Sequence, residues 1–352
     1  MDWNQIPHTA DEPEFAQLQT VLQRGCPKRP TLFEFFLNGP LYARVAGDPD
    51  PDWPEYLRDQ LVVVRAFFRL GYDYSIFRVP GFAFPGGGFE QKATRSINAG
   101  AVIHDRHSLE AYAWMDPDAA SYGVLEDVAA FLPEGGKVIV CWPGGVLENV
   151  ITLVGYEQLC LLILDDPELA GDIFAAVGSR LVRFTEHIAQ YDTVGAVIGN
   201  DDWGFRSQTM LSPADMRRFV FPYHQRAVAA AHRWGKPAIL HSCGCLREVM
   251  DDVIGTMAYD GKHSYEDAIQ PVEDAYQQYG ARIALLGGID LDFICRSAPE
   301  AVYRRSREML ERTTGTGAFA LGTGNSVPEY VPDEGYFAMI RAALDARSSS
   351  SP

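Results

Sequence analysis

Three residues with side chains that bind soft metals lie together at the end of a predicted strand. Residues 237–240 form a short apolar run typical of a buried strand, and His241, Cys243 and Cys245 follow it directly. Alternate residues of a strand face the same side, so His241 and Cys243 can reach one point. Imidazole and thiolate are ligands that zinc prefers. The spacing therefore predicts a metal site, with one alternative: a hydrogen-bonded core histidine beside small buried thiols.

Eight short apolar runs alternate with helical patterns along the chain. They cover residues 31–36, 72–79, 137–142, 194–200, 237–240, 257–262, 282–288 and 317–321. Alternating strands and helices indicate a parallel sheet, and eight such units predict a single (β/α)8 TIM-type barrel of the α/β class. An open doubly wound sheet is the alternative, but no G-x-G-x-x-G motif follows the first strand. We expect an N-terminal helical segment over residues 1–28, the barrel over 29–345 and a disordered tail over 346–352.

The connection between the second and third predicted strands, residues 80–136, is unusually long. It contains three consecutive glycines, at positions 86 to 88, and aromatic residues that argue against disorder: Phe82, Phe84, Phe89, Tyr112 and Trp114. Long loops in compact domains are usually functional or disordered. We therefore interpret this insertion as a lid over the mouth of the barrel, made mobile by its glycines.

Polar residues at the carboxyl ends of the predicted strands are candidates for a site, because active sites of (β/α)8 barrels form there. The candidates for catalysis are Asp73, Asp201, Asp202 and His263. The candidates for substrate binding are Glu34, Arg78, Glu148, Trp203, Lys262 and Asn325. Single residues also have structural explanations, such as helix capping by Asp201 or ion pairing by Lys262. Their occurrence on consecutive strands favours a functional site.

Composition narrows the class of partner. The net charge is −17 with a pI near 4.8, and such a surface repels nucleic acid and anionic membranes. The six cysteines are scattered apart from one pair, which favours a reducing, cytoplasmic setting over a disulfide framework. The N-terminus is acidic and polar, unlike a signal peptide, and no apolar run approaches the roughly 18 residues that span a membrane. These features predict a cytoplasmic protein that binds neither nucleic acid nor membranes.

Several motifs in combination resemble the uroporphyrinogen decarboxylase superfamily. They are DDWG at the fourth predicted strand, HSCG at the fifth, GKHSYED at the sixth, LLGGID at the seventh and LGTGNSVPEYVP at the eighth. The resemblance extends over residues 29–343 and implies a (β/α)8 barrel, often as a homodimer. It implies one of two activities. One is decarboxylation of uroporphyrinogen acetate groups without a cofactor, and the other is zinc-dependent methyl transfer between a corrinoid protein and a thiol or related group.

The chain departs from both branches of that superfamily. Decarboxylases carry substrate-binding arginines after the first strand, whereas residues 32–38 here read LFEFFLN, and they carry a histidine where this chain has Thr323. Methyltransferases resemble this chain at His241 and Cys243 but add a later cysteine, in the region that holds Asn325 here. The candidates for completing the metal site are Asp201, Asp202, Cys245 and His263.

The expected function is a zinc-dependent methyltransferase that moves a methyl group between a small substrate and a corrinoid protein. A carboxylate ligand in place of a thiolate would leave zinc more electrophilic, which favours an oxygen substrate such as an aryl methyl ether. Nothing in the chain resembles a cobalamin-binding domain, so the corrinoid is expected on a partner protein. The alternatives are a metal-free decarboxylase of a porphyrinogen-like or other small carboxylate, and a barrel that binds a small molecule without turning it over.

Overall fold

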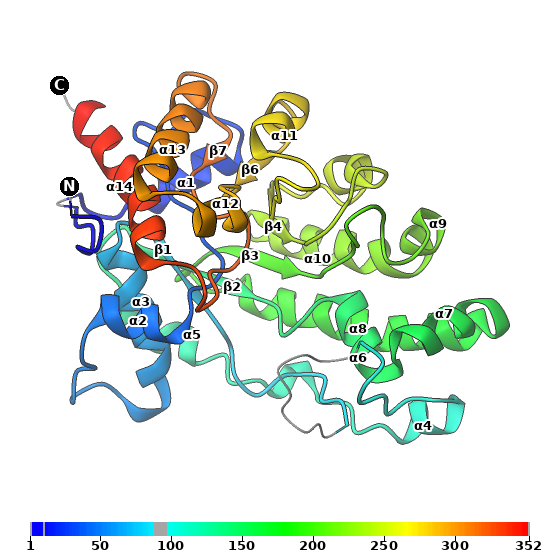
Figure 1. Cartoon of the computed structure of the whole chain (residues 1–352). Helices are drawn as coiled ribbons and strands as arrows, with labels where there is room; N and C mark the ends of the chain where they lie inside the picture. Colours follow the sequence, from blue (N-terminus) through cyan, green and yellow to red (C-terminus); the bar gives the residue numbers. More distant parts are fainter. Residues whose placement is uncertain (1, 10, 88–96, 351–352) are drawn as a thin grey trace.

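The computed structural model describes residues 2–9, 11–87 and 97–350. Within these ranges, seven strands form one curled parallel sheet in sequential order, with helices around it (Figure 1). The strands are β1 (Tyr74–Phe77), β2 (Lys137–Cys141), β3 (Val194–Asn200), β4 (Ala238–His241), β5 (Gly261–His263), β6 (Ala284–Leu286) and β7 (Phe319–Ala320). All neighbouring strands are parallel, as expected when helices connect successive strands. The predicted α/β class and parallel sheet are confirmed.

The helices include long covering helices and short turns. The longer ones are α1 (Phe15–Leu22), α2 (Gly39–Ala46), α3 (Arg58–Arg69), α6 (Val146–Val154), α7 (Tyr156–Asp165), α8 (Pro167–Ile188), α10 (Phe221–Arg233), α11 (Val272–Tyr279), α13 (Pro299–Thr313) and α14 (Asp333–Ser350). The shorter ones are α4 (Arg106–Ala111), α5 (Val124–Asp127), α9 (Pro213–Asp215), α12 (Leu291–Arg296), η1 (Glu55–Leu57), η2 (Pro117–Ala119), η3 (Val128–Phe131), η4 (Met216–Val220) and η5 (Asp252–Thr256). No single helix in the described ranges is long and apolar enough to cross a membrane, and the chain bends by 95° between the adjacent apolar helices α6 and α7.

The two edges of the sheet are joined by residues 31–37, which form isolated bridges instead of a regular strand. Leu32 pairs with Leu321, next to β7, in a parallel bridge. On the other side, the Tyr74 hydroxyl of β1 donates to Glu34 O at 2.6 Å and accepts from Glu34 N–H at 2.7 Å. A tyrosine side chain therefore takes the place of a backbone ladder at this edge. The prediction of a regular strand over residues 31–36 is wrong, although the segment occupies the position between β7 and β1.

Two further predicted boundaries need correction. The strand predicted at residues 257–262 is limited to β5, because the backbone N–H groups of Met257 and Tyr259 donate back to the turn of η5 that precedes them. The tail predicted to be disordered from residue 346 is helical through residue 350, the end of α14. Arg347 fixes this helix, since its buried guanidinium donates to Pro30 O at 2.8 Å and Gly71 O at 2.9 Å.

The insertion after β1 holds α4, η2, α5 and η3, and its described parts pack against α6. The N–H groups of Val102 and Ile103 both donate to Leu153 O, at 2.7 and 2.9 Å. Gly87 N–H donates to Gly100 O at 2.9 Å. Residues 88–96, including the last of the three glycines, lie outside the described residues. The lid therefore stays a prediction.

The register of the central strands places the candidate residues side by side. Asn200 at the end of β3 pairs with His241 at the end of β4, which in turn pairs with His263 at the end of β5. These strands are buried along almost their whole length. Because the strands are parallel, their carboxyl ends lie at the same end of the sheet, where the loops that follow them can meet.

Candidate metal centre

Two glycines bring the loops after β3 and β4 into contact. Gly204 N–H donates to Cys243 O at 3.2 Å, and Cys245 N–H donates to Phe205 O at 2.8 Å. A Cβ on Gly244 would lie 2.1 Å from the carbonyl oxygen of Gly204, and Gly244 has a φ of +84°, so a side chain is excluded there. The DDWG and HSCGC motifs are therefore two halves of one loop structure.

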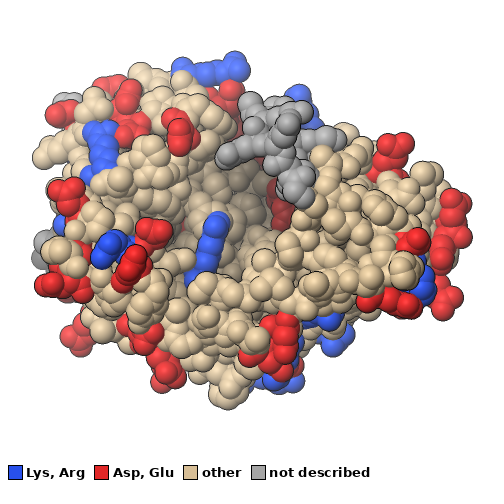
Figure 2. Space-filling view, turned by 90° about the horizontal axis from the view of Figure 1, so that it is seen from below, with Lys and Arg blue, Asp and Glu red and all other residues tan. Residues whose placement is uncertain are grey.

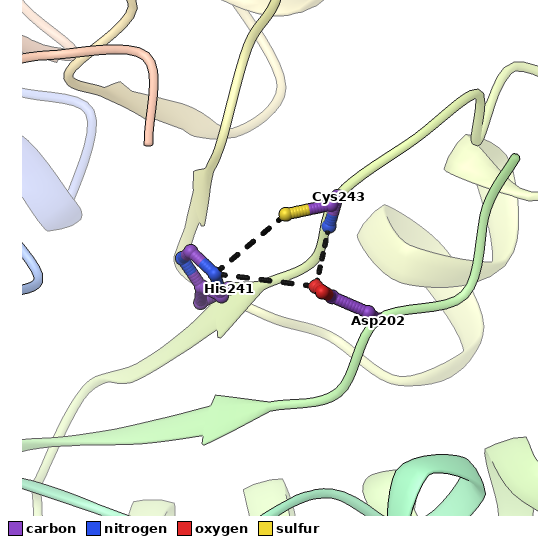
Figure 3. Close-up of side chains that lie close together, drawn as sticks. All are labelled: Asp202, His241 and Cys243. Atoms are coloured by element: carbon purple, nitrogen blue, oxygen red, sulfur yellow. Dashed lines mark hydrogen bonds and ion pairs between the residues drawn. The ribbon is translucent and has the colours of Figure 1, made fainter. Parts of the chain in front are cut away.

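Asp202, His241 and Cys243 each direct one metal-binding atom toward the others (Figure 3). His241 Nε2 lies 4.0 Å from Cys243 Sγ and 4.0 Å from Asp202 Oδ1. The backbone N–H of Cys243 donates to Asp202 Oδ1 at 2.8 Å and holds the carboxylate in place. The three atoms lie within 4.8 Å of one another, and nitrogen, sulfur and carboxylate oxygen are the donors found in zinc sites. The three side chains thus fit a zinc ion, and Asp202 is the residue placed to serve as a third ligand.

A chain of hydrogen bonds decides which nitrogen of His241 carries the proton. The carbonyl oxygen of Thr323 can only accept, so His263 Nε2–H donates to it at 3.1 Å. His263 Nδ1 is then bare and accepts from His241 Nδ1–H at 2.7 Å. Burial lowers the pKa of His263 to about 3 and that of His241 well below its usual value, so both rings are neutral. His241 is left with a lone pair on Nε2, the atom that faces Asp202 and Cys243.

The Cys243 thiol is surrounded by donors. Asn325 Nδ2 donates to its sulfur at 3.2 Å and the Ser264 hydroxyl at 3.6 Å. Burial, with a smaller effect of the Asp202 charge, raises the pKa of Cys243 to about 12. The side chain is therefore a thiol when no cation is nearby. A bound cation would ionise it, and the two donors would then stabilise the thiolate.

Asp201, predicted to be catalytic, has a structural role. Its fully buried carboxylate accepts from the N–H groups of Leu147 and Glu148 at the start of α6, at 3.0 and 2.9 Å. It also lies 2.9 Å from His224 Nε2. A carboxylate at a helix N-terminus is stabilised by the free N–H groups and the helix dipole. These contacts occupy both oxygens, so Asp201 anchors α6 beneath the site.

Glu148, predicted to bind substrate, lies near the carboxylates of Asp201 and Asp202. Burial raises its pKa to about 8, with further contributions from Asp201 and Asp202. One oxygen accepts from Gly145 N–H at 3.1 Å. At neutral pH Glu148 is therefore mainly a neutral acid next to the metal-binding residues.

Asp73 and Cys245 lie apart from the cluster. Asp73 precedes β1, at the end of the sheet opposite the site, where it pairs with Arg29 at 2.5 Å and accepts from Glu14 N–H at 2.8 Å. The prediction that Asp73 is catalytic is therefore wrong. Cys245 lines a neighbouring cavity together with Lys262, and the described metal-binding cluster does not include it. The close contact between Gly204 and Gly244, just before Cys245, turns the chain away from the metal-binding cluster.

Trp203 and Lys262, predicted to bind substrate, are held inside the protein. Trp203 is fully buried and packs against Phe221 and His224, with ring centroids 5.2 and 4.8 Å apart. The Lys262 ammonium donates to the carbonyl oxygen of Ser264, and burial lowers its pKa to about 8. Lys262 thus fastens the β5 loop and reaches the candidate metal centre only through its charge.

Glu34 and Arg78 lie on different levels of the barrel mouth. Glu34 is fully buried, accepts from the Thr323 hydroxyl at 2.8 Å, and has its pKa raised to about 8 by burial. It supports the β7 loop from below and cannot reach a ligand. Arg78 is exposed at the end of β1, and its guanidinium stacks on the Phe36 ring at 4.4 Å. Of the two, only Arg78 remains a candidate for binding a ligand.

Sequence reasoning missed Phe35 and the role of Thr323. The Phe35 ring lies 4.2 Å from that of His241 and fixes one face of the imidazole. Thr323 contributes its carbonyl oxygen to the histidine chain, which requires no particular side chain. A signal for Thr323 was available, since it lies between two glycines. A Cβ on Gly322 would lie 1.7 Å from Phe33 O.

Comparison with known proteins places these residues within one family. The profile of the uroporphyrinogen decarboxylase (URO-D) family matches residues 137–345, which is more than half of the chain and runs from β2 into α14. All three residues of the candidate metal centre fall inside the matched region.

The relatives of known activity fall into two groups. A methylated-thiol–coenzyme M methyltransferase of Methanosarcina mazei is 26% identical over 194 residues, which cover 55% of this chain and 49% of that protein. A uroporphyrinogen decarboxylase of Streptomyces avermitilis is 27% identical over 242 residues, covering 64% of this chain and 62% of the relative. The matches thus span about half to three fifths of the relatives' own lengths.

A solved structure supports the fold over nearly the full chain. A methyltransferase from Methanosarcina mazei superposes with a TM-score of 0.70, covering 95% of this chain and 99% of that one at 15% sequence identity. At this identity the likeness concerns the architecture alone. It includes the N-terminal part of the chain, which the family profile does not reach.

Proposed function

The chain belongs to the uroporphyrinogen decarboxylase (URO-D) family, and from that premise we propose that it is a zinc-dependent methyltransferase. The observation that carries this proposal is the convergence of Asp202, His241 and Cys243 on one point. Metal-free decarboxylation gives no reason for a thiol and an imidazole to share that point. A thiol, a carboxylate and a bare imidazole nitrogen together match the donor set of a zinc site.

The residues around the ion have separate tasks. His241 offers Nε2, and the bond between the two histidines keeps that nitrogen free of a proton. Cys243 and Asp202 supply two negative charges once the thiol has ionised. Asn325 and Ser264 donate to the sulfur and lower its basicity. When bound, zinc supplies the Lewis acidity that polarises a substrate oxygen or acidifies a thiol.

The proposed substrate is a small methyl ether, and the methyl acceptor is a corrinoid carried by a second protein. The methyl–oxygen bond breaks, and the oxygen keeps the electron pair and takes up a proton from solvent. The cobalt(I) of the corrinoid supplies the electron pair of the new cobalt–carbon bond. A carboxylate ligand favours this choice over a simple thiol, because it weakens the Lewis acidity of zinc less than a second thiolate would. The protein is further proposed to be cytoplasmic and to form a homodimer.

Decarboxylation is the competing activity, because relatives of both kinds match the chain to a similar degree. The described residues around Glu34 offer no arginine pair for a substrate with many carboxylates. Asp73 and Asp202 are the two aspartates that could serve as the acid of a decarboxylase, and of these Asp73 pairs with Arg29 at the opposite end of the sheet. The third option, a barrel that binds without turnover, requires no metal centre at all.

Metal content and methyl transfer separate these functions. We expect one zinc per chain by elemental analysis after purification without added metal. We also expect methylcobalamin to form from cob(I)alamin and an aryl methyl ether, followed by visible absorbance. Cys243→Ser should abolish both, whereas Cys245→Ser, two residues away and outside the cluster, should retain both.

Each alternative function predicts a different experimental result. Release of carbon dioxide from uroporphyrinogen by a zinc-free protein would establish the decarboxylase. Zinc-free protein that performs neither reaction yet binds small molecules would establish the binding barrel. Either result would overturn the methyltransferase proposal.

A further inference from the structure

A second cavity opens at the carboxyl ends of β1, β2 and β3, beside the candidate metal centre. Its walls are largely apolar and aromatic, with Phe36, Phe82 and Trp142 among them, and its polar members include Arg78 and Asn200. Figure 2 shows that the molecule is hollowed on the face it presents, with walls made mainly of uncharged residues. An apolar cavity with a few convergent polar groups is the usual form of a small-molecule site.

Arg78 supplies the positive charge of this cavity. Its guanidinium lies over the Phe36 ring at 4.4 Å, and in the described part of the chain no carboxylate forms an ion pair with it. The cavity also contains the Cys141 thiol, which interacts with Arg78, and Gln60, whose Oε1 accepts from the Arg78 backbone N–H at 3.4 Å. A guanidinium that stacks on a ring and has no carboxylate partner among the described residues is suited to bind the carboxylate of a ligand through two parallel hydrogen bonds.

Asn200 supplies an unused acceptor in the same cavity. Its Oδ1 is buried and receives no hydrogen bond from the residues that the structure describes. Buried polar atoms are normally paired, so an unpaired one in a cavity wall points to a group supplied by a ligand. A hydroxyl on a ligand ring would satisfy it.

Two aromatic rings and the strand register connect the cavity wall to the metal-binding residues. The rings of Phe36 and Phe35 lie 4.0 Å apart, and Phe35 lies 4.2 Å from His241. Asn200 pairs with His241 in the sheet and precedes Asp202 by two residues. A ligand held by Arg78 and Asn200 is therefore directed along the same wall toward the imidazole.

We propose that this cavity binds the ring of an aromatic carboxylate, so that the substrate class is a methoxybenzoate bearing a ring hydroxyl. The carboxylate pairs with Arg78, the hydroxyl donates to Asn200 Oδ1, and the aromatic walls enclose the ring. The position of the methyl group rests on the proposed function. Recognition of the ring and its carboxylate rests on the cavity alone.

The test uses 4-hydroxybenzoate as the probe and its uncharged methyl ester as the matched ligand, with binding measured by calorimetry on the full chain. Arg78→Gln should weaken 4-hydroxybenzoate about tenfold or more, the loss typical of a hydrogen bond to a charged group, and leave the ester nearly unchanged. Asn200→Leu should remove the preference for 4-hydroxybenzoate over benzoate. Arg296→Gln, which changes an exposed arginine paired with Asp292, should alter neither affinity.

Cys243→Ser distinguishes failure of this inference from failure of the proposed function. That variant should lose zinc and methyl transfer and still bind 4-hydroxybenzoate. Wild-type protein that binds zinc and transfers methyl groups but prefers the ester would overturn the cavity assignment and leave the methyltransferase intact. Equal loss of both ligands in Arg78→Gln, or no loss of either, would also overturn it.

Discussion

His263 acts on His241 and not on a substrate. Its Nδ1 holds the proton of the neighbouring ring, and its Nε2 is occupied by a backbone carbonyl. Both nitrogens are therefore committed, and neither can move a proton in a reaction. His263, predicted to be catalytic, is a positioning residue for the proposed zinc ligand. Such partners of metal-binding histidines fix the ring and raise its basicity.

Replacing His263 by Phe should raise the zinc dissociation constant by roughly 10–100-fold, because His241 loses the acceptor that fixes its proton. The aromatic ring keeps the packing against Phe33, whose centroid lies 5.3 Å away. Chelator competition at neutral pH measures the effect. His263→Gln, which retains an acceptor oxygen, should restore part of the affinity, and exposed His107→Gln should behave as wild type. Unchanged zinc affinity in His263→Phe would contradict the positioning role.

Asn325 lies close enough to the metal centre for its side chain to matter. Its Nδ2 is 3.2 Å from Cys243 Sγ, while its Oδ1 accepts from Ser326 N–H at 2.8 Å. Asn325→Cys would add a second thiolate at this position, and zinc should bind about tenfold or more tightly with altered turnover. Ser326→Cys adds the same group one residue further along and serves as the control. If both variants bind zinc as wild type does, Asn325 is only a local cap and the argument for an oxygen substrate weakens.

The sequence identified the residue types of the site but could not separate neighbours. His241 and Cys243 were predictable because strand alternation puts them on one side. Asp201 and Asp202 are adjacent and chemically identical, and only the position of α6 decides that one is buried while the other faces the histidine. Cys245 is a candidate from the sequence because it follows the same predicted strand as His241 and Cys243. The contact between the two loop glycines, which links distant parts of the chain, turns it away.

At the level of secondary-structure elements, substitutions of Asp201 and Asp202 should have different effects, one on stability and the other on metal binding. Asp201→Asn removes a charge that the first turn of α6 requires, and the free energy of unfolding should fall by about 2–3 kcal/mol. Asp202→Asn should change it by less than about 0.5 kcal/mol without metal, since that side chain is partly exposed, and should weaken zinc binding. Urea unfolding of metal-free protein measures the first effect. An equal loss of stability in both variants would place Asp202 in the scaffold.

Strands were predictable where burial is continuous. Residues 137–142, 194–200 and 237–240 are almost uniformly apolar, and the strands observed there agree within a residue at each end. The apolar run at 257–262 predicted too long a strand. Met257 and Tyr259 are buried but lie in a turn, and a pattern of apolar residues does not reveal the backbone conformation. The segment at 31–36 lacks a ladder for a reason outside its own sequence. Its neighbour β1 presents a tyrosine hydroxyl where a backbone partner would otherwise be.

For the whole molecule, closure of the sheet depends on that hydroxyl. Tyr74→Phe leaves the N–H and the carbonyl of Glu34 buried without partners, so the free energy of unfolding should fall by about 2–4 kcal/mol. Denaturant unfolding measures the change, with Tyr56→Phe, a tyrosine that is 64% exposed, as the control. A loss no larger than that of the control would mean that packing alone closes the barrel.

The same closing segment should give the molecule a pH-dependent stability. Burial raises the pKa of Glu34 from 4.5 to about 8, so between these values the folded chain holds a proton that the unfolded chain releases. Where the folded state binds more protons, stability falls as pH rises. The contribution of Glu34 to the free energy of unfolding is constant below pH 4.5. Between pH 4.5 and pH 8 it falls by about 1.4 kcal/mol per pH unit, which amounts to a few kcal/mol near pH 8.

Glu34→Gln isolates this effect, because an amide keeps an acceptor for the Thr323 hydroxyl and does not titrate. The variant and the wild type should unfold with similar free energies near pH 5. The variant should become progressively more stable than wild type toward pH 8, by about 2–4 kcal/mol. Urea unfolding at pH 5, 6, 7 and 8 gives the difference directly. Other titrating groups, Glu148 among them, are present in both proteins and cancel in that difference. A gap that is the same at pH 5 and pH 8 would show that Glu34 keeps an ordinary pKa and does not couple barrel closure to pH.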